Sequence, residues 1–405
     1  MRIIHIITRL ILGGAQENTL LTCEDLLRQY GDQVLLVTGP PEGPEGSLLE
    51  RARAGGVPMV LLPSLCRPIA PWRDLVSYLA LRRIIRRFQP EVVHTHSAKA
   101  GILGRAVAWQ LRVPVIVHTV HGAPFHPYQP AIARWFFRAC ERWAARRCHR
   151  LVCVAQALAD QLAAAGVAER EKMITIYSGM EVQPFLQADR YRAEYRERLG
   201  WGPEYVVVGK IARLFYLKGH EYLLEAAPKI VAQMPKVRFL LIGDGILRPK
   251  IQQQIRQAGL ADYFRLVGLV PPEEIPRWIA AMDILVHVSL REGLARALPQ
   301  ALLVGRPVVS FDIDGAREVV LPEKTGLLLR PKDSEALAEA VVRLAKDPEL
   351  RTQMGLEGRR RCHQVFRHQH MTAQLRALYE QLFQEATLQG RVHSCHFRKG
   401  RGRQG

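Results

Sequence analysis

Short apolar runs rich in β-branched residues alternate with longer amphipathic stretches along most of the chain. The short runs have the composition of buried strands, and the longer stretches space their apolar residues as on one face of a helix. In the first half we predict strands over Ile3–Thr8, Gln33–Thr38, Pro58–Leu62, Val92–Thr95, Pro114–Thr119, Leu151–Val154 and Met173–Tyr177. Strands that alternate with helices indicate βαβ units and a parallel sheet.

The alternation is interrupted by the polar stretch Ala188–Trp201 and then resumes, with strands predicted over Tyr205–Ile211, Val237–Ile242, Phe264–Val267, Ile284–His287, Pro307–Phe311 and Gly326–Leu329. We therefore predict an α/β protein of two Rossmann-like, doubly wound domains facing across a cleft, where such sheets bind ligands. The predicted parts are a first domain over 1–187, a linker over 188–204, a second domain over 205–367, a closing helix over 368–388 that returns to the first domain, and a basic disordered tail over 389–405.

Length and cysteine usage agree with this division. The 405 residues suit two domains better than one. The seven cysteines are scattered, without zinc-knuckle spacing, which favours a reducing, cytoplasmic location. We find no apolar run long enough to span a membrane.

The net charge of +19 is concentrated in two segments. Residues 66–150 contain 15 Lys/Arg and 3 Asp/Glu, and residues 358–405 contain 10 and 2. Local excess charge favours an anionic partner, and nucleic acid, anionic lipid and a phosphorylated substrate all stay open.

Three strand-to-helix turns carry candidate chemistry. Gly13 and Gly14 follow the first strand, where glycine allows a ligand close to the backbone and a helix N-terminus favours an anion. Arg213 and Lys218 follow another strand, and two cations there could converge on a diphosphate and neutralise it as it leaves. The alternatives are a structural glycine pair and two solvated cations.

The third turn contains Glu292, whose carboxylate could accept hydrogen bonds from sugar hydroxyls. The amides of Gly293 and Leu294 could contact phosphate oxygens, and Gln300 lies about two helical turns further on. Alternatively, Glu292 is a first-turn acid that the helix dipole favours.

With these turns, the motifs His121-Gly122, Gly243-Asp244-Gly245 and Gly305-Arg306-Pro307 occur in the order seen in glycosyltransferase family 4, which the chain resembles from Ile3 to about Leu382. The resemblance implies a GT-B fold and a retaining, metal-independent transfer from a nucleotide-diphosphate sugar, with UDP or GDP as the nucleotide and no cofactor. It also implies a saccharide or lipid-linked acceptor at the first domain, and a role in cell-envelope or exopolysaccharide synthesis.

The resemblance assigns the site residues as well. Arg213 and Lys218 would bind the diphosphate, Glu292 would contact the donor sugar, and His121 would lie beside the reaction centre. Gly13, Gly14, Gly243, Gly293, Leu294 and Gln300 would bind substrate. Two departures are Gln300, where the family has a second glutamate that binds the ribose, and Gln16, where many relatives have glutamate.

Two groups suggest a metal site, and we predict none. Asp312-Ile313-Asp314 matches the DxD pattern, but its place before Gly315 favours a turn or helix-cap role. His94, His96, His118 and His121 cluster at strand ends without a carboxylate or cysteine at ligand spacing. We expect them to be neighbouring histidines in a polar cleft.

The segment 133–147 combines Trp135, Phe136 and Trp143 with arginines. It suits either insertion into an anionic membrane surface, with 66–150 as the contact region, or an ordinary core-packed helix.

Three rival functions stay open: a nucleotide-sugar epimerase of the same architecture, a nucleic-acid-binding protein, and an inactive sugar-nucleotide sensor in which Gln300 has replaced the acid. No nucleic-acid motif is present, and no specific nucleic acid is expected.

Overall fold

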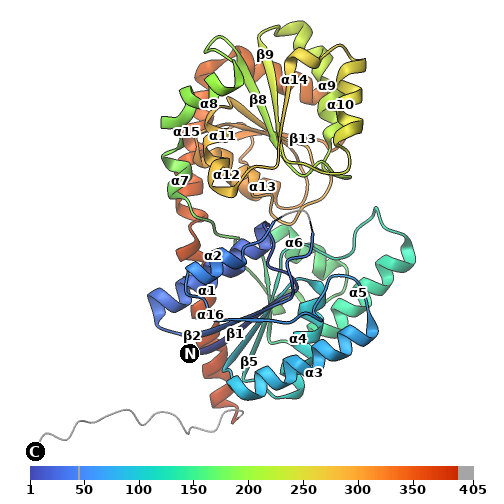
Figure 1. Cartoon of the computed structure of the whole chain (residues 1–405), viewed down its shortest axis with the longest axis vertical. Coiled ribbons are helices and arrows are strands. Elements are labelled where there is room, and N and C mark those ends of the chain that lie inside the picture. Colours follow the sequence, from blue (N-terminus) through green and yellow to red (C-terminus); the bar gives the residue numbers. More distant parts are fainter. Residues whose placement is uncertain (44–45, 391–405) are drawn as a thin grey trace, which may run out of the picture. The chain divides into compact units, whose positions relative to one another are not determined.

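Every strand in the described part of the chain, residues 1–43 and 46–390, belongs to one of two parallel sheets in this computed structural model (Figure 1). The seven-stranded sheet has the order β3-β2-β1-β4-β5-β6-β7, and the six-stranded sheet has the order β10-β9-β8-β11-β12-β13. The prediction of two doubly wound α/β domains is confirmed.

The strands fall where the apolar runs predict them. The first sheet contains β1 (Arg2–Ile7), β2 (Gln33–Thr38), β3 (Met59–Leu61), β4 (Val92–His96), β5 (Val115–Val120), β6 (Arg150–Cys153) and β7 (Met173–Thr175). The second contains β8 (Val206–Ile211), β9 (Val237–Ile242), β10 (Phe264–Gly268), β11 (Ile284–His287), β12 (Val308–Phe311) and β13 (Gly326–Leu329).

Helices connect the strands of each sheet. Those of the first half are α1 (Gly14–Tyr30), α2 (Leu49–Ala54), α3 (Pro71–Phe88), α4 (Ala98–Gln110), α5 (Ala131–Ala145), α6 (Gln156–Ala164) and the 3-10 turn η1 (Arg170–Lys172). Those of the second half are α7 (Gln183–Leu186), η2 (Ala188–Tyr191), α8 (Arg192–Leu199), α9 (His220–Gln233), α10 (Arg248–Gln257), η3 (Ala261–Tyr263), η4 (Pro272–Glu274), α11 (Ile275–Ala280), α12 (Ala297–Leu303), α13 (Ala316–Val319), α14 (Ser334–Lys346), α15 (Pro348–Val365) and α16 (His368–Leu388).

The last helix belongs to the first unit. That unit contains residues up to Cys153, then Ala159–Ile176, then the chain from Gln369, and the second contains Val154–Leu158 and Tyr177–His368. Met371, Leu378 and Leu382 of α16 share an apolar core with strands β1, β2 and β5, and Figure 1 shows α16 running along the first sheet. This confirms the predicted return of the closing helix.

The segment predicted as a linker, 188–204, is instead part of the second unit. It forms η2 and α8, and the guanidinium groups of Arg192 and Arg196 each donate to the Asp283 carboxylate at 2.5 Å. An ion pair with a residue so far along the chain gives no local signal, so the polar composition alone predicted a linker. The predicted tail lies outside the described residues except for Gln389 and Gly390.

The strand order places each topological switch point beside a central strand. In both sheets, the next two strands of the chain are added on one side of the first strand, and the later strands are added on its other side. The switch points therefore lie between β1 and β4 and between β8 and β11. Ligands of such sheets bind at the carboxyl ends of the strands at this point. A ligand site is therefore expected at the carboxyl ends of these four strands.

Candidate active site

The clearest polar cluster of the second unit lies at its switch point. The Lys218 ammonium follows β8, the Glu292 carboxylate follows β11, and Lys218 Nζ donates to Glu292 Oε1 at 2.6 Å. Each side chain keeps about a fifth of its surface exposed, 20% and 19%. The structure thus brings together two of the predicted catalytic residues.

Neighbouring groups hold Glu292 in its charged form. His287 Nε2, at the end of β11, lies 3.4 Å from the same Oε1 atom. Burial alone would raise the pKa of Glu292, but the Lys218 ammonium and the His287 ring outweigh it and lower that pKa well below its ordinary value. A carboxylate that stays ionised at all physiological pH values is suited to accept hydrogen bonds from hydroxyl groups.

The turn that carries Glu292 is fixed by Asp314. The Glu292 backbone N–H donates to Asp314 Oδ2 at 2.7 Å, and Asp314 has a left-handed backbone (φ 45°). Asp312, the other acid of the DxD pattern, pairs with Arg317. Asp314 therefore has the turn-holding role that the sequence favours for this pattern.

Arg213 begins the loop that leads from β8 to Lys218. Its backbone carbonyl accepts a hydrogen bond from His220 Nε2 at 3.0 Å, and its guanidinium lies over the Phe215 ring at 5.7 Å. Gly219 then adopts a left-handed backbone (φ 67°), and a Cβ atom there would come within 1.7 Å of the Val288 carbonyl oxygen. This close packing holds the Lys218 loop against the turn that follows β11.

Gly243 shapes the same edge of the sheet. Its φ is 127°, and a Cβ atom there would lie 2.2 Å from the Ala212 carbonyl oxygen. Leu294 is buried behind the Glu292 turn, its side chain 3.1 Å from where a Cβ atom of Gly315 would lie. Gly293 lies in that turn, and Gln300 is half-buried on α12. The role of these residues in substrate binding stays a prediction.

Lys210 is a candidate that the sequence reasoning missed. It lies on β8, its side chain is 1% exposed, and among the described residues its Nζ has no hydrogen-bond partner. Burial and the Lys218 ammonium lower the pKa of Lys210 to about 7. A lysine inside the apolar run VVVGKI is the signal that could have revealed it, because a lysine is almost never fully buried without a partner.

The remaining predicted residues lie in the first unit. Gly13 is the extended N-cap of α1, which begins at Gly14 (φ of Gly13 −178°). A Cβ atom on Gly13 would meet only the flexible Gln16 side chain at 2.6 Å, so the packing there does not demand glycine. His121 follows β5, is half-buried, and its Nε2 lies 3.1 Å from His96 Nδ1.

The histidines beside His121 are buried rather than part of a polar cleft. His5, His94 and His96 are fully buried, and His118 is nearly so. Ring nitrogens of the first three lie within 4.8 Å of one another, which is metal-ligand spacing. Both nitrogens of His94 and of His96 already have hydrogen-bond partners, so a metal ion would have to displace these contacts. The arrangement fits a hydrogen-bonded network better than a metal site.

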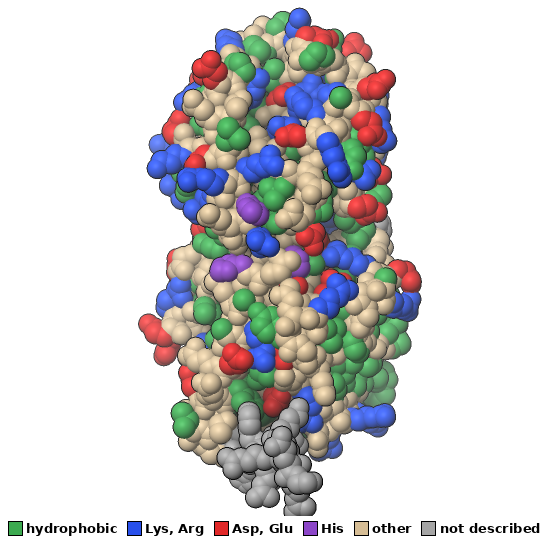
Figure 2. All heavy atoms as spheres, turned by 90° about the vertical axis from the view of Figure 1, so that its left-hand side faces the viewer, with side chains coloured by type: hydrophobic (Ala, Val, Ile, Leu, Met, Phe, Trp, Pro, Cys, Tyr) green, Lys and Arg blue, Asp and Glu red, His purple; other side chains and the backbone are tan. Residues whose placement is uncertain are grey.

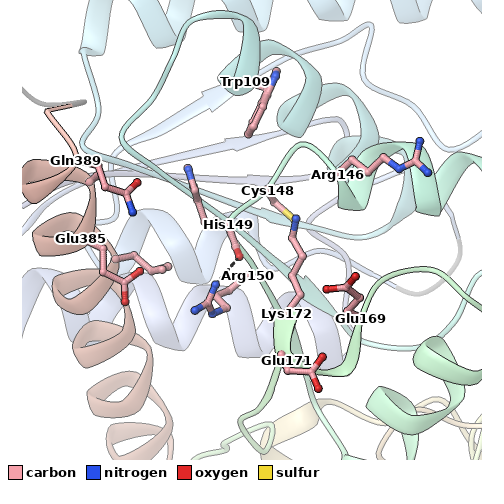
Figure 3. Close-up of a pocket in the computed structure, with 12 residues that line it drawn as sticks. Trp109, Arg146, Cys148, His149, Arg150, Glu169, Glu171, Lys172, Glu385 and Gln389 are labelled. Carbon is pink, nitrogen blue, oxygen red and sulfur yellow. Dashed lines mark hydrogen bonds between the residues drawn. The ribbon is translucent and has the colours of Figure 1, made fainter.

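A pocket of about 450 Å³ lies elsewhere in the first unit (Figure 3). It opens beside the amino end of β6, away from the carboxyl ends where ligands bind. Its lining mixes cations with carboxylates, namely Arg146, Arg150, Lys172, Glu169, Glu171 and Glu385, together with Trp109 and His149. This balance of charge gives no preference for an anionic ligand, so we do not include the pocket in the candidate site.

Comparisons with known proteins agree on one kind of chemistry. A family model described as "Glycosyl transferase 4-like domain" matches residues 13–179, and one described as "Glycosyl transferases group 1" matches residues 191–361. UDP-Gal:alpha-D-GlcNAc-diphosphoundecaprenol alpha-1,3-galactosyltransferase of Escherichia coli is 29% identical over 353 residues, which are 86% of this chain and 89% of that protein. Alpha-D-kanosaminyltransferase of Streptomyces kanamyceticus is 26% identical over 342 residues, 79% and 87% of the two chains.

Solved structures share the fold. Alr3699/HepE of Anabaena, in complex with UDP and glucose, superposes with a TM-score of 0.78 at 22% identity over 94% of this chain and 99% of that one. Sucrose-phosphate synthase of Thermosynechococcus elongatus superposes with a TM-score of 0.80 at 22% identity over 95% and 100%. Both similarities extend over the two sheets and their helices.

Proposed function

The chain belongs to glycosyltransferase family 4 and has the GT-B fold, and we propose that it transfers a sugar from a nucleotide-diphosphate sugar to a saccharide or lipid-linked acceptor with retention of configuration. The observation that carries the proposal is the contact between Lys218 and Glu292 at the switch point of the second sheet. Relatives act in cell-envelope and polysaccharide synthesis, as the galactosyltransferase of E. coli and a capsular polysaccharide glycosyltransferase of Staphylococcus aureus illustrate.

The cations after β8 would bind the donor diphosphate. Lys210, Arg213 and Lys218 all come from the end of this central strand or from the loop that follows it. As the bond between sugar and phosphate breaks, negative charge grows on the leaving diphosphate, and fixed cations stabilise that charge. This is the role that Mg²⁺ has in other transferases, so we propose a metal-independent reaction. Glu292 would accept hydrogen bonds from donor-sugar hydroxyls.

Retention is supported by the products of the relatives. The galactosyltransferase of E. coli forms an α-1,3 linkage from UDP-galactose, and the sugar in that donor is α-linked to the diphosphate. By analogy, the acceptor oxygen would attack the face from which the diphosphate departs, and a diphosphate oxygen would take the acceptor's proton. No residue of this chain then needs to act as a covalent nucleophile.

Thermal stabilisation by nucleotides tests the donor site. We expect one of UDP, GDP and ADP to raise the melting temperature, because a ligand that binds only the folded state stabilises it by mass action. The rise should be the same with and without EDTA and should vanish in Lys218→Ala. A rise that depends on Mg²⁺ would contradict metal independence, and no rise with any nucleotide or nucleotide sugar would contradict the donor site itself.

We also propose that the first unit contacts an anionic membrane surface. The outward face of α3 carries Trp72, Leu75, Val76 and Leu79 at helical spacing and continues into the exposed Arg83, Arg86 and Arg87. The outward face of α5 carries Ile132, Trp135, Phe136 and Trp143, the first of them 83% exposed. Both helices pack on α4 (Figure 1), so we name their exposed faces together the α3–α5 surface.

The composition of the α3–α5 surface favours lipid over nucleic acid. Large apolar side chains beside arginines fit a helix that lies in the headgroup region of an anionic bilayer. Figure 2 draws the opposite side of the molecule, the left-hand side of Figure 1, where lysine and arginine side chains are interspersed with acidic ones. No helix in residues 1–43 and 46–390 is long and apolar enough to cross a bilayer.

Vesicle co-sedimentation tests this surface. The protein should bind vesicles of phosphatidylcholine with phosphatidylglycerol, less so at high salt. Ile132→Ser and Trp135→Ser should each remove the ~1.5–3 kcal/mol of free energy gained when the apolar side chain is buried in the bilayer. Binding should therefore fall at least about tenfold. Leu356→Ser, an equally apolar change at an exposed residue of the second unit, should have no effect. Equal binding by all variants would contradict the surface.

A further inference from the structure

Three histidines of the first unit form a continuous hydrogen-bonded string that ends at His121. His5 Nδ1, on β1, lies 3.0 Å from His96 Nε2, on β4. His96 Nδ1 lies 3.1 Å from His121 Nε2, and the rings of His96 and His121 are stacked. The string runs across the β1–β4 switch point, from the interior of the sheet to the residue expected beside the donor sugar.

The interior members of the string are neutral. His5 and His96 have no exposed surface. Burial lowers the pKa of His5 to about 3, and burial together with the neighbouring histidines lowers the pKa of His96 well below its ordinary value. A neutral imidazole has one N–H donor and one acceptor nitrogen. Each contact in the string therefore needs one donor, and the direction of one hydrogen bond determines the direction of the other.

Only two directions are consistent with these contacts. In the first, His5 Nδ1–H donates to His96 Nε2, and His96 Nδ1–H donates to His121 Nε2. In the second, His121 Nε2–H donates to His96, and His96 donates to His5. The second direction leaves a proton on His5 Nε2, which is buried and has no hydrogen-bond partner among the described residues.

A buried N–H without an acceptor is rarer than a buried acceptor without a donor, and an unpaired buried N–H costs its full desolvation penalty. The first direction avoids the unpaired N–H, and it makes His121 Nε2 an acceptor. The proton of a neutral His121 must then be on Nδ1.

We propose that His5 and His96 are positioning residues that hold His121 in its Nδ1–H tautomer, so that His121 presents a hydrogen-bond donor at Nδ1. An unconstrained histidine in water prefers the Nε2–H tautomer, so the string reverses the ordinary preference. The donor role of His121 toward an oxygen of the sugar or phosphate rests on the proposed function, whereas its tautomer does not.

The tautomer can be read directly from long-range ¹H–¹⁵N correlation spectra of protein labelled with ¹⁵N-histidine. We expect a neutral Nδ1–H pattern for His121, assigned by its loss in His121→Gln. His149 provides an internal reference, because its Nδ1 accepts from the Ile116 backbone N–H at 2.8 Å and its proton must be on Nε2. The two residues should show opposite patterns in one spectrum.

Matched variants test whether the string sets the tautomer. His5→Leu and His96→Leu should shift His121 toward Nε2–H. His5→Asn and His96→Asn should retain Nδ1–H, because the asparagine amide can donate from near the position of Nδ1. The leucine variants should also lower kcat about tenfold to a hundredfold, by analogy with the loss seen when the partners that orient metal-ligating histidines are removed, with KM for the donor nearly unchanged. The asparagine variants should recover most of kcat.

Three outcomes would overturn the inference. These are an Nε2–H or doubly protonated His121 in the wild type, an unchanged tautomer in both leucine variants whose histidine spectra otherwise show the native fold, or leucine and asparagine variants with equal kcat. The spectra report the tautomer whether or not a donor is found. Failure of the proposed transfer and failure of this inference are therefore distinguishable.

Discussion

Lys218→Ala should lower kcat/KM for the donor about 10²–10³-fold, the typical cost of removing one preorganised group that stabilises transition-state charge. The reason is its position: the ammonium lies at the switch point, 2.6 Å from the Glu292 carboxylate. Its binding of UDP or GDP should weaken as well, because the ammonium is placed to contact the diphosphate in the bound state. Initial rates over a range of donor concentrations, and titration calorimetry with the nucleoside diphosphate, measure the two effects.

A matched lysine is available as the control. Lys229 is also in the second unit and also pairs with an acid, Glu335, but both side chains are more than half exposed. Lys229→Ala should leave rates and nucleotide affinity unchanged, since an exposed ion pair contributes little. If the two alanine variants behaved alike, Lys218 would be an ordinary surface cation, and the assignment of the diphosphate site would be wrong.

The companion variant Glu292→Gln separates two roles of the pair. The amide keeps the shape of the side chain and removes the negative charge. If Glu292 contacts sugar hydroxyls, loss of its carboxylate charge should reduce transfer. UDP alone should bind at least as tightly as to the wild type, because no carboxylate then competes with the diphosphate for the Lys218 ammonium. Weaker UDP binding in Glu292→Gln would indicate that the carboxylate acts by positioning Lys218.

The fold could be predicted because its signals are local. Apolar runs such as VRFLLI of β9 and VIVHTV of β5 are bounded by proline or glycine and differ sharply from the amphipathic stretches between them. The segment 188–204 shows the limit of this approach. Its polar residues look solvated, yet Arg196 is buried against Asp283, which is 87 residues away in sequence.

The site residues that lie in turns could be predicted from the sequence, and those that lie within strands could not. Lys218 and Glu292 lie in loops after strands, where a charged residue suggests function, and the structure brings them into contact. Lys210 lies inside a strand and was assigned to the sheet. His5 likewise lies within a predicted strand, and only the parallel register that pairs it with His94 shows that β1 and β4 contribute to one cluster.

Lys210→Met should raise the free energy of unfolding of the unliganded protein at pH 7. An ordinary lysine has a pKa of 10.5, and burial together with the Lys218 ammonium lowers that of Lys210 to about 7. Each unit of difference corresponds to about 1.4 kcal/mol, so the protonated lysine destabilises the folded state by roughly 5 kcal/mol. Methionine fills a similar volume without charge, and we expect it to recover a few kcal/mol of this cost.

The pH dependence gives the sign of the effect. Between about pH 7 and 10.5 the unfolded chain keeps a proton on Lys210 that the folded protein has released. The unfolded state then binds more protons, so the stability of the wild type rises with pH across this window. In Lys210→Met this contribution is absent, and its advantage over the wild type should be largest at or below pH 7 and should shrink toward pH 10.

Urea denaturation at several pH values between 7 and 10 measures the stability of the wild type and of Lys210→Met. Lys236→Met, at an exposed lysine of the same unit, should follow the wild type.

A buried charged residue that lowers stability and has no partner is expected at a functional site. Lys210→Met should therefore also bind nucleoside diphosphate more weakly. In the wild type the bound diphosphate would favour the protonated, cationic form of Lys210, and methionine cannot supply this charge. A variant that is more stable but binds the nucleotide as tightly as the wild type would place Lys210 outside the donor site, and one that is less stable at pH 7 would show that the buried amine has a partner in solution.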